Sequence, residues 1–170
     1  MQILLLIILI LIILAQLCLG IFGILMILSV IIGVPFIPTK NKDAKKMIEL
    51  AKIKAGTKIV DLGSGAGRLL FLAEKNGAVA TGYELNPFLT LWTKLVARLK
   101  NKHKKITIHT KSLYDANLSN IEVVFTYLMP GPMEKLTNKL YSELKPGSLV
   151  VTNSFSIPNK KPDIVSGDIM

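Results

Sequence analysis

The chain has 170 residues, 51% of them apolar, and a net charge of +10 from 21 lysines and arginines against 11 aspartates and glutamates. The apolar content excludes a disordered or collagen-like chain, and the uncharged stretch before Lys40 excludes an ordinary soluble domain. The single cysteine, Cys18, excludes an intrachain disulfide and a multi-cysteine metal site, so we expect no metal.

Residues 1–34 are expected to form a transmembrane anchor. A helix needs about 20 apolar residues to span a bilayer, and residues 3–34 are uncharged and almost wholly apolar. One spanning helix is favoured over a hairpin that turns at residues 20–23, because each arm of the hairpin would be near the short limit. No basic residue precedes the run and no small-residue cleavage motif follows it, which favours a retained anchor over a cleaved signal peptide. Lysines follow the run, so the positive-inside rule predicts a single-pass membrane protein whose remaining chain is cytoplasmic.

Two prolines follow the anchor and predict an extended stretch, because proline cannot continue a helix and restricts the residue before it. The apolar spacing that comes next predicts a helix over residues 42–54, which Thr39 or Asn41 can cap. We therefore assign residues 35–57 to a linker and an N-terminal helix, and residues 58–170 to one domain.

Strand and helix patterns alternate through that domain. Short apolar runs predict five strands, at residues 58–62, 78–84, 106–109, 121–127 and 148–155. Helical spacing predicts helices at residues 68–76, 87–100 and 132–144. This alternation predicts an α/β fold with a parallel sheet covered by helices on both faces. The run at 121–127 is apolar on both faces, so we expect that strand to be buried on both sides.

The helix that begins at Asn86 and Pro87 has the strongest start signal, since asparagine caps helices and proline suits the first helical position. Its large apolar residues share one face, and we expect Trp92 to pack in the core. These residues are Phe88, Leu91, Trp92, Leu95 and Leu99. The basic residues between Lys94 and Lys105 suit an anionic lipid surface or a solvated helix end. No aromatic RNA-binding motif accompanies them, so we expect no specific nucleic acid partner.

The turn after the first strand, residues 61–68, reads DLGSGAGR. Its glycines can adopt positive φ and let the backbone approach a ligand. A P-loop would need Gly-Lys-Ser/Thr at the end of the turn, and a dinucleotide-binding turn would need glycine where Arg68 stands. Asp61, before the first glycine, suits an amine, and Glu84 at the end of the second strand can accept both hydroxyls of a ribose. The pattern therefore favours an aminoacyl-nucleoside without phosphates.

Residues 61–68 resemble motif I of the class I S-adenosylmethionine-dependent methyltransferases. More specifically, the chain resembles the small membrane-anchored protein-lysine methyltransferases, which include the enzymes that modify the ATP synthase c-subunit and the adenine nucleotide translocase, and their prokaryotic relatives. The further similar segments are residues 35–39, 82–87, 130–133 and 155–158. The resemblance extends from about residue 35 to residue 158, which is most of the chain beyond the anchor.

The resemblance implies a Rossmann-like sheet, S-adenosyl-L-methionine as cofactor, and methyl transfer to a lysine amine of a membrane-associated protein. The cofactor-binding residues that it implies are Asp61, Gly63, Ser64, Gly65, Gly67, Glu84, Asn86, Ser112 and Leu113. Among them Asp61 and the glycines would surround the methionine part, and Glu84 would hold the ribose. Tyr127 would face the methyl group and orient the acceptor amine. No general base is evident, and desolvation beside a cation would lower the pKa of the acceptor lysine.

Two other functions stay open: a phospholipid or isoprenoid methyltransferase, and a non-catalytic membrane-tethered nucleoside-binding protein. Class I methyltransferases usually add two strands after the fifth, but only residues 156–170 remain here, of which 163–165 can begin one strand. We therefore expect a sheet shortened to about five strands. Its open edge would have to be covered, for example by a partner or a second copy of the chain.

Overall fold

The computed structural model describes residues 1–31 and 37–170, and side chains for residues 1–27 and 37–170. Pro35 and Phe36, with which the predicted linker begins, lie outside the described residues. The chain divides into two compact units, Met1–Phe36 and Ile37–Met170.

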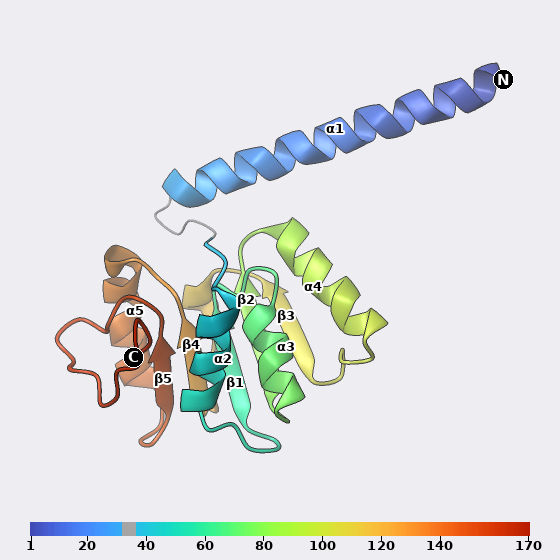
Figure 1. Ribbon diagram of the computed structural model, residues 1–170. Coiled ribbons are helices and arrows are strands. Elements are labelled where there is room, and N and C mark those ends of the chain that lie inside the picture. Colours follow the sequence, from blue (N-terminus) through green and yellow to red (C-terminus); the bar gives the residue numbers. More distant parts are fainter. Residues whose placement is uncertain (32–36) are drawn as a thin grey trace. The chain divides into compact units, whose positions relative to one another are not determined.

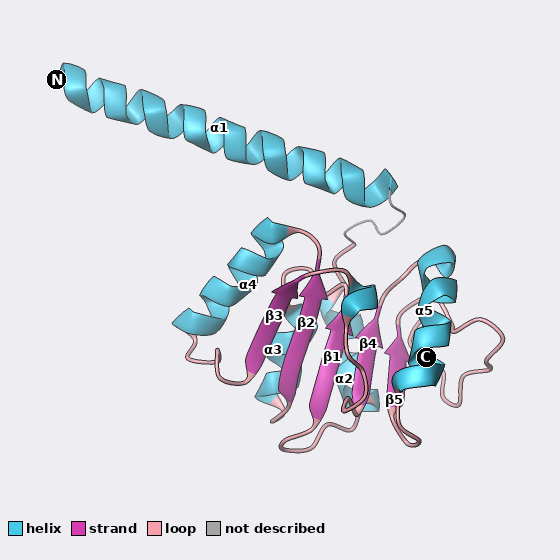
Figure 2. Cartoon of the chain, turned by 180° about the vertical axis from the view of Figure 1, so that it is seen from behind, coloured by secondary structure: helices cyan, strands magenta, loops and turns pink. Residues whose placement is uncertain are grey.

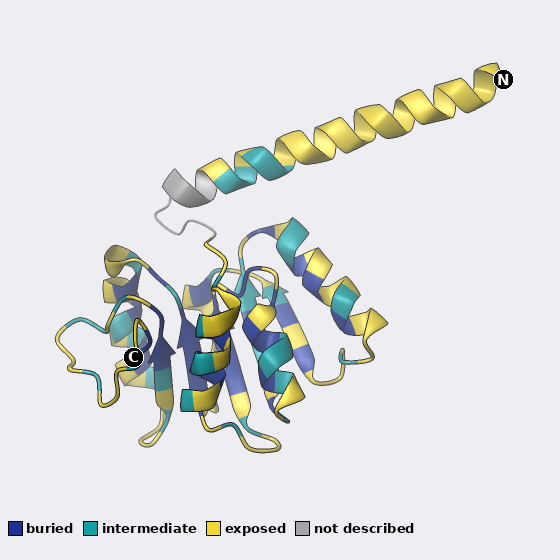
Figure 3. Ribbon diagram, in the orientation of Figure 1, coloured by how far each residue is buried: buried dark blue, intermediate teal, exposed yellow. Residues whose placement is uncertain are grey.

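The described part of the first unit is one helix, α1 (Gln2–Ile31). It continues without a break through Gly20 and Gly23, so the hairpin alternative is wrong (Figure 1). Within the described residues, the segment Gln2–Ile27 is the one helix long and apolar enough to cross a membrane. Between Ile3 and Ile27 most of its large apolar side chains are exposed (Figure 3), as expected for a helix that contacts lipid.

The second unit is built on a five-stranded, wholly parallel sheet with the order β3-β2-β1-β4-β5. Its strands are β1 (Lys58–Leu62), β2 (Val79–Glu84), β3 (Ile106–Thr110), β4 (Val123–Thr126) and β5 (Leu149–Thr152). The predicted five-stranded parallel sheet is therefore confirmed. All four residues of β4 are buried, as its apolar sequence predicts, because β4 has a strand on each side and covered faces.

Helices cover both faces of the sheet. Their bounds are α2 (Asn41–Leu50), α3 (Arg68–Lys75), α4 (Pro87–Leu99) and α5 (Pro130–Glu143), with a short 3-10 helix, η1 (Leu113–Asp115). Figures 1 and 2 show α2 and α3 on one face, α4 beside them at the β3 edge, and α5 on the opposite face. Residues of α2, α3 and the sheet form one apolar core, which includes Met47, Leu70 and Phe125.

The helix α2 is shorter than the sequence predicts and differs at its start. It ends at Leu50 rather than near residue 54, because Lys52 adopts a positive φ of 46° and its N–H closes back on the carbonyl of Glu49 at 3.2 Å. Its N-cap is Lys40, and neither Thr39 nor Asn41 caps it through a side chain.

The helix α4 begins as predicted, since the Asn86 side chain accepts hydrogen bonds from the first turn. Leu91, Trp92, Leu95 and Leu99 are exposed, however, and the expectation that Trp92 packs in the core is wrong. Small residues are buried in its place, because the sheet and the glycine turn approach closely: the Thr90 and Thr110 hydroxyls are 2.8 Å apart. A Cβ built on Gly67 would lie only 2.6 Å from Cγ2 of Thr93, so the turn leaves no room for a larger side chain at position 93 of α4.

The chain's own C-terminal residues pair with the end of β5. Thr152 and Met170 exchange two backbone hydrogen bonds of 2.7 and 3.0 Å, and Ile169 is buried in the core. Residues 163–165, where the sequence allowed a further strand, form none in the described chain. The sheet edge is thus covered near Thr152, and a partner that covers the rest of the edge stays a prediction.

Candidate active site

The candidate site lies at the carboxyl ends of β1, β2 and β4. β1 is the central strand, and the chain leaves it toward β2 and β3 on one side and toward β4 and β5 on the other. In open parallel sheets, ligands bind in the crevice beyond the strand ends where the strand order reverses in this way. The topology therefore places Asp61, Glu84 and Tyr127 at the edge of the sheet where a ligand is expected.

The glycine turn is fastened to the end of β2 by its own backbone. The N–H groups of Gly63 and Ser64 both donate to the carbonyl of Tyr83, at 2.9 and 3.0 Å, and the N–H of Gly65 donates to Oε2 of Glu84 at 2.9 Å. Turns that bind phosphates need such N–H groups directed at the ligand. Because these three amides already have acceptors within the protein, the turn suits a ligand that presents no phosphate to them.

Glycine is required in the turn for two physical reasons. Gly63 and Gly67 have positive φ angles of 87° and 78°, which side chains other than glycine adopt at a cost. A Cβ on Gly67 would collide with Thr93, whereas a Cβ on Gly63 would meet nothing within 4 Å. The turn is therefore packed against α4 on one side and open beside Gly63.

Ser64 is buried, and its hydroxyl has no hydrogen-bond partner in the described part of the chain. Its Oγ lies 2.7 Å from the position that a Cβ on Gly82 would occupy, so Gly82 makes room for this side chain on β2. The side chain of Ser64 thus fills the space between the turn and β2. Its predicted contact with a cofactor stays a prediction.

The carboxyl group of Asp61 is buried in the site and has a raised pKa. It is 5% exposed, and no described residue donates a hydrogen bond to its carboxylate. Burial, and secondarily the charge of Glu84, raise the pKa of the Asp61 carboxyl from 3.8 to about 7. A positive charge placed beside it would favour the ionised form. Asp61 therefore suits a cationic group such as an ammonium.

Glu84 is held with both carboxylate oxygens oriented. Oε2 accepts from the N–H of Gly65 at 2.9 Å, and Oε1 accepts from the N–H of Asn86 at 2.8 Å. Each carboxylate oxygen can accept two hydrogen bonds, so each keeps one position for a ligand hydroxyl. Two fixed acceptors on one carboxylate match a pair of neighbouring hydroxyls, such as those of a ribose.

Asn86 occupies the link between the site and α4. Its Oδ1 accepts from the N–H groups of Phe88 and Leu89 at 3.0 and 3.4 Å, and its own N–H fixes Glu84. The structure therefore gives Asn86 a positioning role, while a direct contact with cofactor stays a prediction.

Ser112 and Leu113 follow β3, which neighbours β2 in the sheet. The Ser112 hydroxyl accepts from the N–H of Tyr114 at 3.3 Å and starts η1, and Leu113 is buried. Within the described residues, no hydrogen bond joins either of them to the glycine turn or to Glu84. Their proposed place beside an adenine is compatible with their position on this edge and stays a prediction.

Tyr127 follows β4 and lies beside Phe155, which follows β5. Their ring centroids are 6.5 Å apart with an interplanar angle of 28°. Phe155 was not among the predicted site residues, although it begins the segment 155–158 that carries part of the family resemblance. The two rings form an aromatic surface next to the carboxyl end of the central strands.

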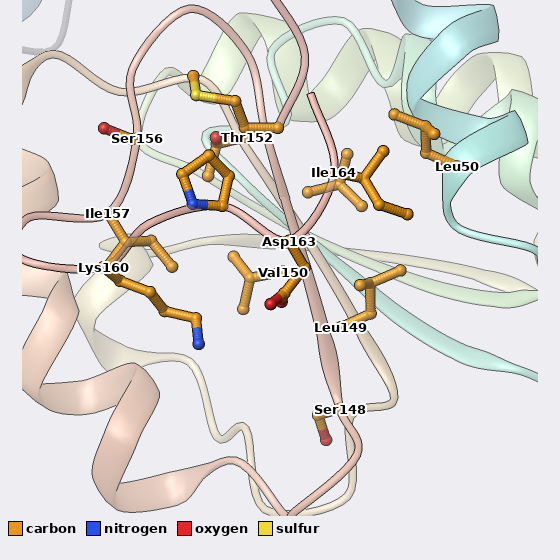
Figure 4. Close-up of a pocket in the computed structure, with 13 residues that line it drawn as sticks. Leu50, Ser148, Leu149, Val150, Thr152, Ser156, Ile157, Lys160, Asp163 and Ile164 are labelled. Carbon is orange, nitrogen blue, oxygen red and sulfur yellow. The ribbon is translucent and has the colours of Figure 1, made fainter. Parts of the chain in front are cut away.

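A separate pocket of about 190 Å³ lies beside β5 (Figure 4). It is lined by β5, by Leu50 of α2 and by the C-terminal segment, including Lys160 and Asp163. Neither Asp61, Glu84 nor any residue of the glycine turn lines it, so this pocket is distinct from the candidate site.

Comparison with solved structures confirms the fold. An RNA methyltransferase from Salinibacter ruber, solved in complex with S-adenosyl-L-homocysteine, superposes with a TM-score of 0.74 at 31% identity and covers 78% of this chain and 90% of its own. A methyltransferase from Thiobacillus denitrificans in complex with the same compound is 21% identical with a TM-score of 0.58, and shows the fold alone.

Curated relatives are named as lysine methyltransferases. The ATP synthase c-subunit lysine N-methyltransferase of Xenopus laevis is 31% identical over 134 residues, which are 79% of this chain and 59% of the relative. A protein-lysine N-methyltransferase of Saccharolobus islandicus is 32% identical over 136 residues, 76% of this chain and 81% of the relative. This chain thus spans less than two thirds of the vertebrate relative and most of the archaeal one.

The model of the ANTKMT methyltransferase domain matches residues 61–164, which begin at Asp61 and include the glycine turn, Glu84, Tyr127 and Phe155. The match covers more than half of the chain and agrees with the relatives and with the fold. The chain therefore belongs to the ANTKMT methyltransferase domain family.

Proposed function

We propose that this chain is an S-adenosylmethionine-dependent methyltransferase that methylates a lysine amine of a membrane-associated protein. The observation that carries the proposal is the presence of two carboxyl groups, the buried one of Asp61 and the oriented one of Glu84, beside the same glycine turn. The backbone N–H groups of Gly63, Ser64 and Gly65 in that turn already donate within the protein, so they are not free to bind a phosphate. This donor and acceptor set fits a cationic amino acid joined to a nucleoside. The names of the relatives support a lysine as acceptor.

In this proposal S-adenosylmethionine, when bound, supplies a methyl group that its sulfonium already activates. Asp61 balances the positive charge of the methionine part, and Glu84 accepts hydrogen bonds from the ribose hydroxyls. The glycines at 63, 65 and 67 shape the turn, with Ser64 filling the space beneath it. Ser112 and Leu113 lie beside the adenine of the cofactor. These residues hold and orient a ligand, and none needs to form a covalent bond with it.

The acceptor amine would enter beside Tyr127 and Phe155. The Tyr127 hydroxyl can accept a hydrogen bond from the amine and so direct its lone pair, while the ring restricts its approach. Alignment of a nucleophile at near-attack distance supplies a large part of the rate of such transfers. The amine must be neutral to react, and its desolvation near a positive charge lowers its pKa.

The membrane part of the proposal rests on α1. We infer a single span, with the second unit on the cytoplasmic side, because the lysines follow the apolar helix and none precede it. A tethered enzyme meets membrane-associated proteins at high local concentration. Relatives named for the ATP synthase c-subunit and for the adenine nucleotide translocase are in keeping with such a substrate.

The test is transfer of a tritiated methyl group from S-adenosylmethionine to isolated membranes by the full chain. We expect the label in protein and, after acid hydrolysis, in methylated lysine. Glu84→Gln is the matched control, which should transfer much less label when the S-adenosylmethionine concentration is below the Kd of the wild-type chain. Label confined to lipid would favour a lipid methyltransferase, and label confined to RNA would favour an RNA substrate. Cofactor binding in a titration without any label transfer would favour a non-catalytic binding protein; each of these three outcomes contradicts the proposal.

A further inference from the structure

One face of α4 is apolar and exposed. Leu91, Trp92, Leu95 and Leu99, here called the α4 stripe, are 65%, 56%, 48% and 75% exposed. Their spacing of three and four residues puts them on one face, opposite the buried Thr90, Thr93 and Ala97. Contiguous exposed apolar side chains of this size mark a surface that binds something.

The α4 stripe is bordered by positive charge. Residues 85–114 contain no aspartate or glutamate. Two cations of this segment are used within the protein: Lys102 pairs with Glu74, and Lys100 lies 5.5 Å from the ring centroid of Phe71. In contrast, Lys94 and Arg98 on α4 form no ion pair with any described residue. Exposed leucines and a tryptophan beside unpaired cations are typical of helices that lie in the plane of an anionic membrane surface.

We propose that α4 is a second membrane-binding element, which lies on an anionic lipid surface with the α4 stripe among the acyl chains and Lys94 and Arg98 among the headgroups. The long stems of lysine and arginine allow this arrangement, since they lie along apolar surface while their charges stay in water. The indole of Trp92 suits the same boundary, because it is apolar with one polar group.

The chain itself favours lipid as the occupant of this surface. Nine residues, 32–40, separate the end of α1 at Ile31 from the start of α2 at Asn41, and the ten Cα–Cα steps across them reach at most about 35 Å when fully extended. A domain tethered to a membrane-spanning helix by so short a connection stays close to the bilayer. A second copy of the chain is a poorer occupant, because each copy carries a net charge of +10 and the two basic surfaces would repel each other.

Docking through α4 would orient the candidate site. Asn86, the N-cap of α4, holds the Glu84 carboxylate through its N–H, so the N-terminal end of α4 is also the border of the site. A domain resting on α4 would therefore present this border close to the lipid surface. Lysines that project just beyond a bilayer would then lie within reach.

Trp92 is the only tryptophan of the chain and reports on the proposal directly. The full chain is reconstituted in vesicles of phosphatidylcholine, with or without phosphatidylserine, and Trp92 emission is recorded with brominated lipids as quenchers. We expect a blue shift and strong quenching in the anionic vesicles, and weaker effects in the neutral ones. Because the readout needs neither cofactor nor methyl transfer, failure of the proposed enzymatic function would leave it unchanged.

The decisive variant is Lys94→Glu with Arg98→Glu, which keeps the α4 stripe and reverses its charge. It should lower the ratio of docked to undocked domain by about tenfold or more, since each basic residue near an anionic surface contributes about 1 kcal/mol. Lys135→Glu with Lys161→Glu makes the same change of charge at exposed residues elsewhere and should leave Trp92 quenching unaltered. Circular dichroism checks that both variants are folded.

Three results would overturn the proposal: absence of quenching in anionic vesicles, equal loss of quenching in the control variant, or a Trp92 shift that depends on protein-to-lipid ratio in neutral vesicles. The last result would assign the α4 stripe to contacts between copies of the chain.

Discussion

Replacing Asp61 by asparagine should stabilise the folded domain at pH 8 while weakening cofactor binding. Burial raises the pKa of Asp61 from 3.8 to about 7, and each pH unit is worth about 1.4 kcal/mol. Keeping this carboxylate ionised in the folded domain therefore costs up to about 4 kcal/mol. Asparagine has nearly the same shape and no charge, so it removes this cost. The net gain in stability is smaller by the cost of burying the asparagine amide without hydrogen-bond partners.

The sign of the pH dependence follows from the raised pKa. Between about pH 4 and pH 7 the folded domain retains a proton on Asp61 that the unfolded chain has released. The contribution of Asp61 to stability is therefore greatest below pH 4 and is lost as the pH rises through 7. The advantage of Asp61→Asn should be small near pH 4 and reach its full size above pH 7.

The assay is urea unfolding of the detergent-solubilised full chain, followed by circular dichroism between pH 4 and pH 8. Because detergent holds α1 helical, the change in signal reports on the second unit. Calorimetric titration of the same samples with S-adenosylmethionine measures affinity, which should also fall for the wild-type protein as Asp61 is protonated below pH 7. An asparagine variant that is no more stable at pH 8, or whose advantage is equal at pH 4, would refute the reasoning.

Three further predictions concern the turn and the strand ends. Glu84→Gln should keep the fold, seen by circular dichroism, and lower S-adenosylmethionine affinity by about tenfold or more in calorimetry, since a charged acceptor of two hydroxyls is lost; unaltered affinity would contradict the ribose role. Gly67→Ala should destabilise the domain by about 1–3 kcal/mol, because φ is positive and the new Cβ meets Thr93. Adding Thr93→Ala should restore part of that loss, and no recovery would show that the collision with Thr93 is unimportant. Tyr127→Phe should slow methyl transfer several-fold with S-adenosylmethionine affinity unchanged, as measured by initial rates; an equal fall in affinity would place Tyr127 in the cofactor pocket instead.

The sheet and the main site residues could be predicted from the sequence because their signals are local. β1 has the predicted bounds, since its apolar run is closed by the glycine turn. Asp61 and Glu84 stand at fixed positions relative to the ends of two neighbouring strands, so a parallel sheet brings them to one edge without any further information.

The orientation of α4 could not be predicted in the same way. Helical periodicity identifies residues that share a face, but not the direction in which the face points. α4 carries a stripe of large apolar residues and a stripe of small ones, and the close approach of Gly67 and Thr110 decides that the small stripe is buried. The pairing of Thr152 with Met170 and the contact of Tyr127 with Phe155 could not be predicted either. In each case the two partners are far apart in the sequence, so no local pattern indicates that they meet.

The attachment of the glycine turn to β2 has a thermodynamic consequence. Hydrogen bonds to the Tyr83 carbonyl and the Glu84 carboxylate already hold the turn in place, so a ligand has little of the turn to order when it binds. Binding to a pre-organised site loses less conformational entropy than binding to a mobile one. We therefore expect the affinity of the candidate site to depend on how well the ligand matches these fixed groups, with no large loop-ordering penalty in the binding entropy.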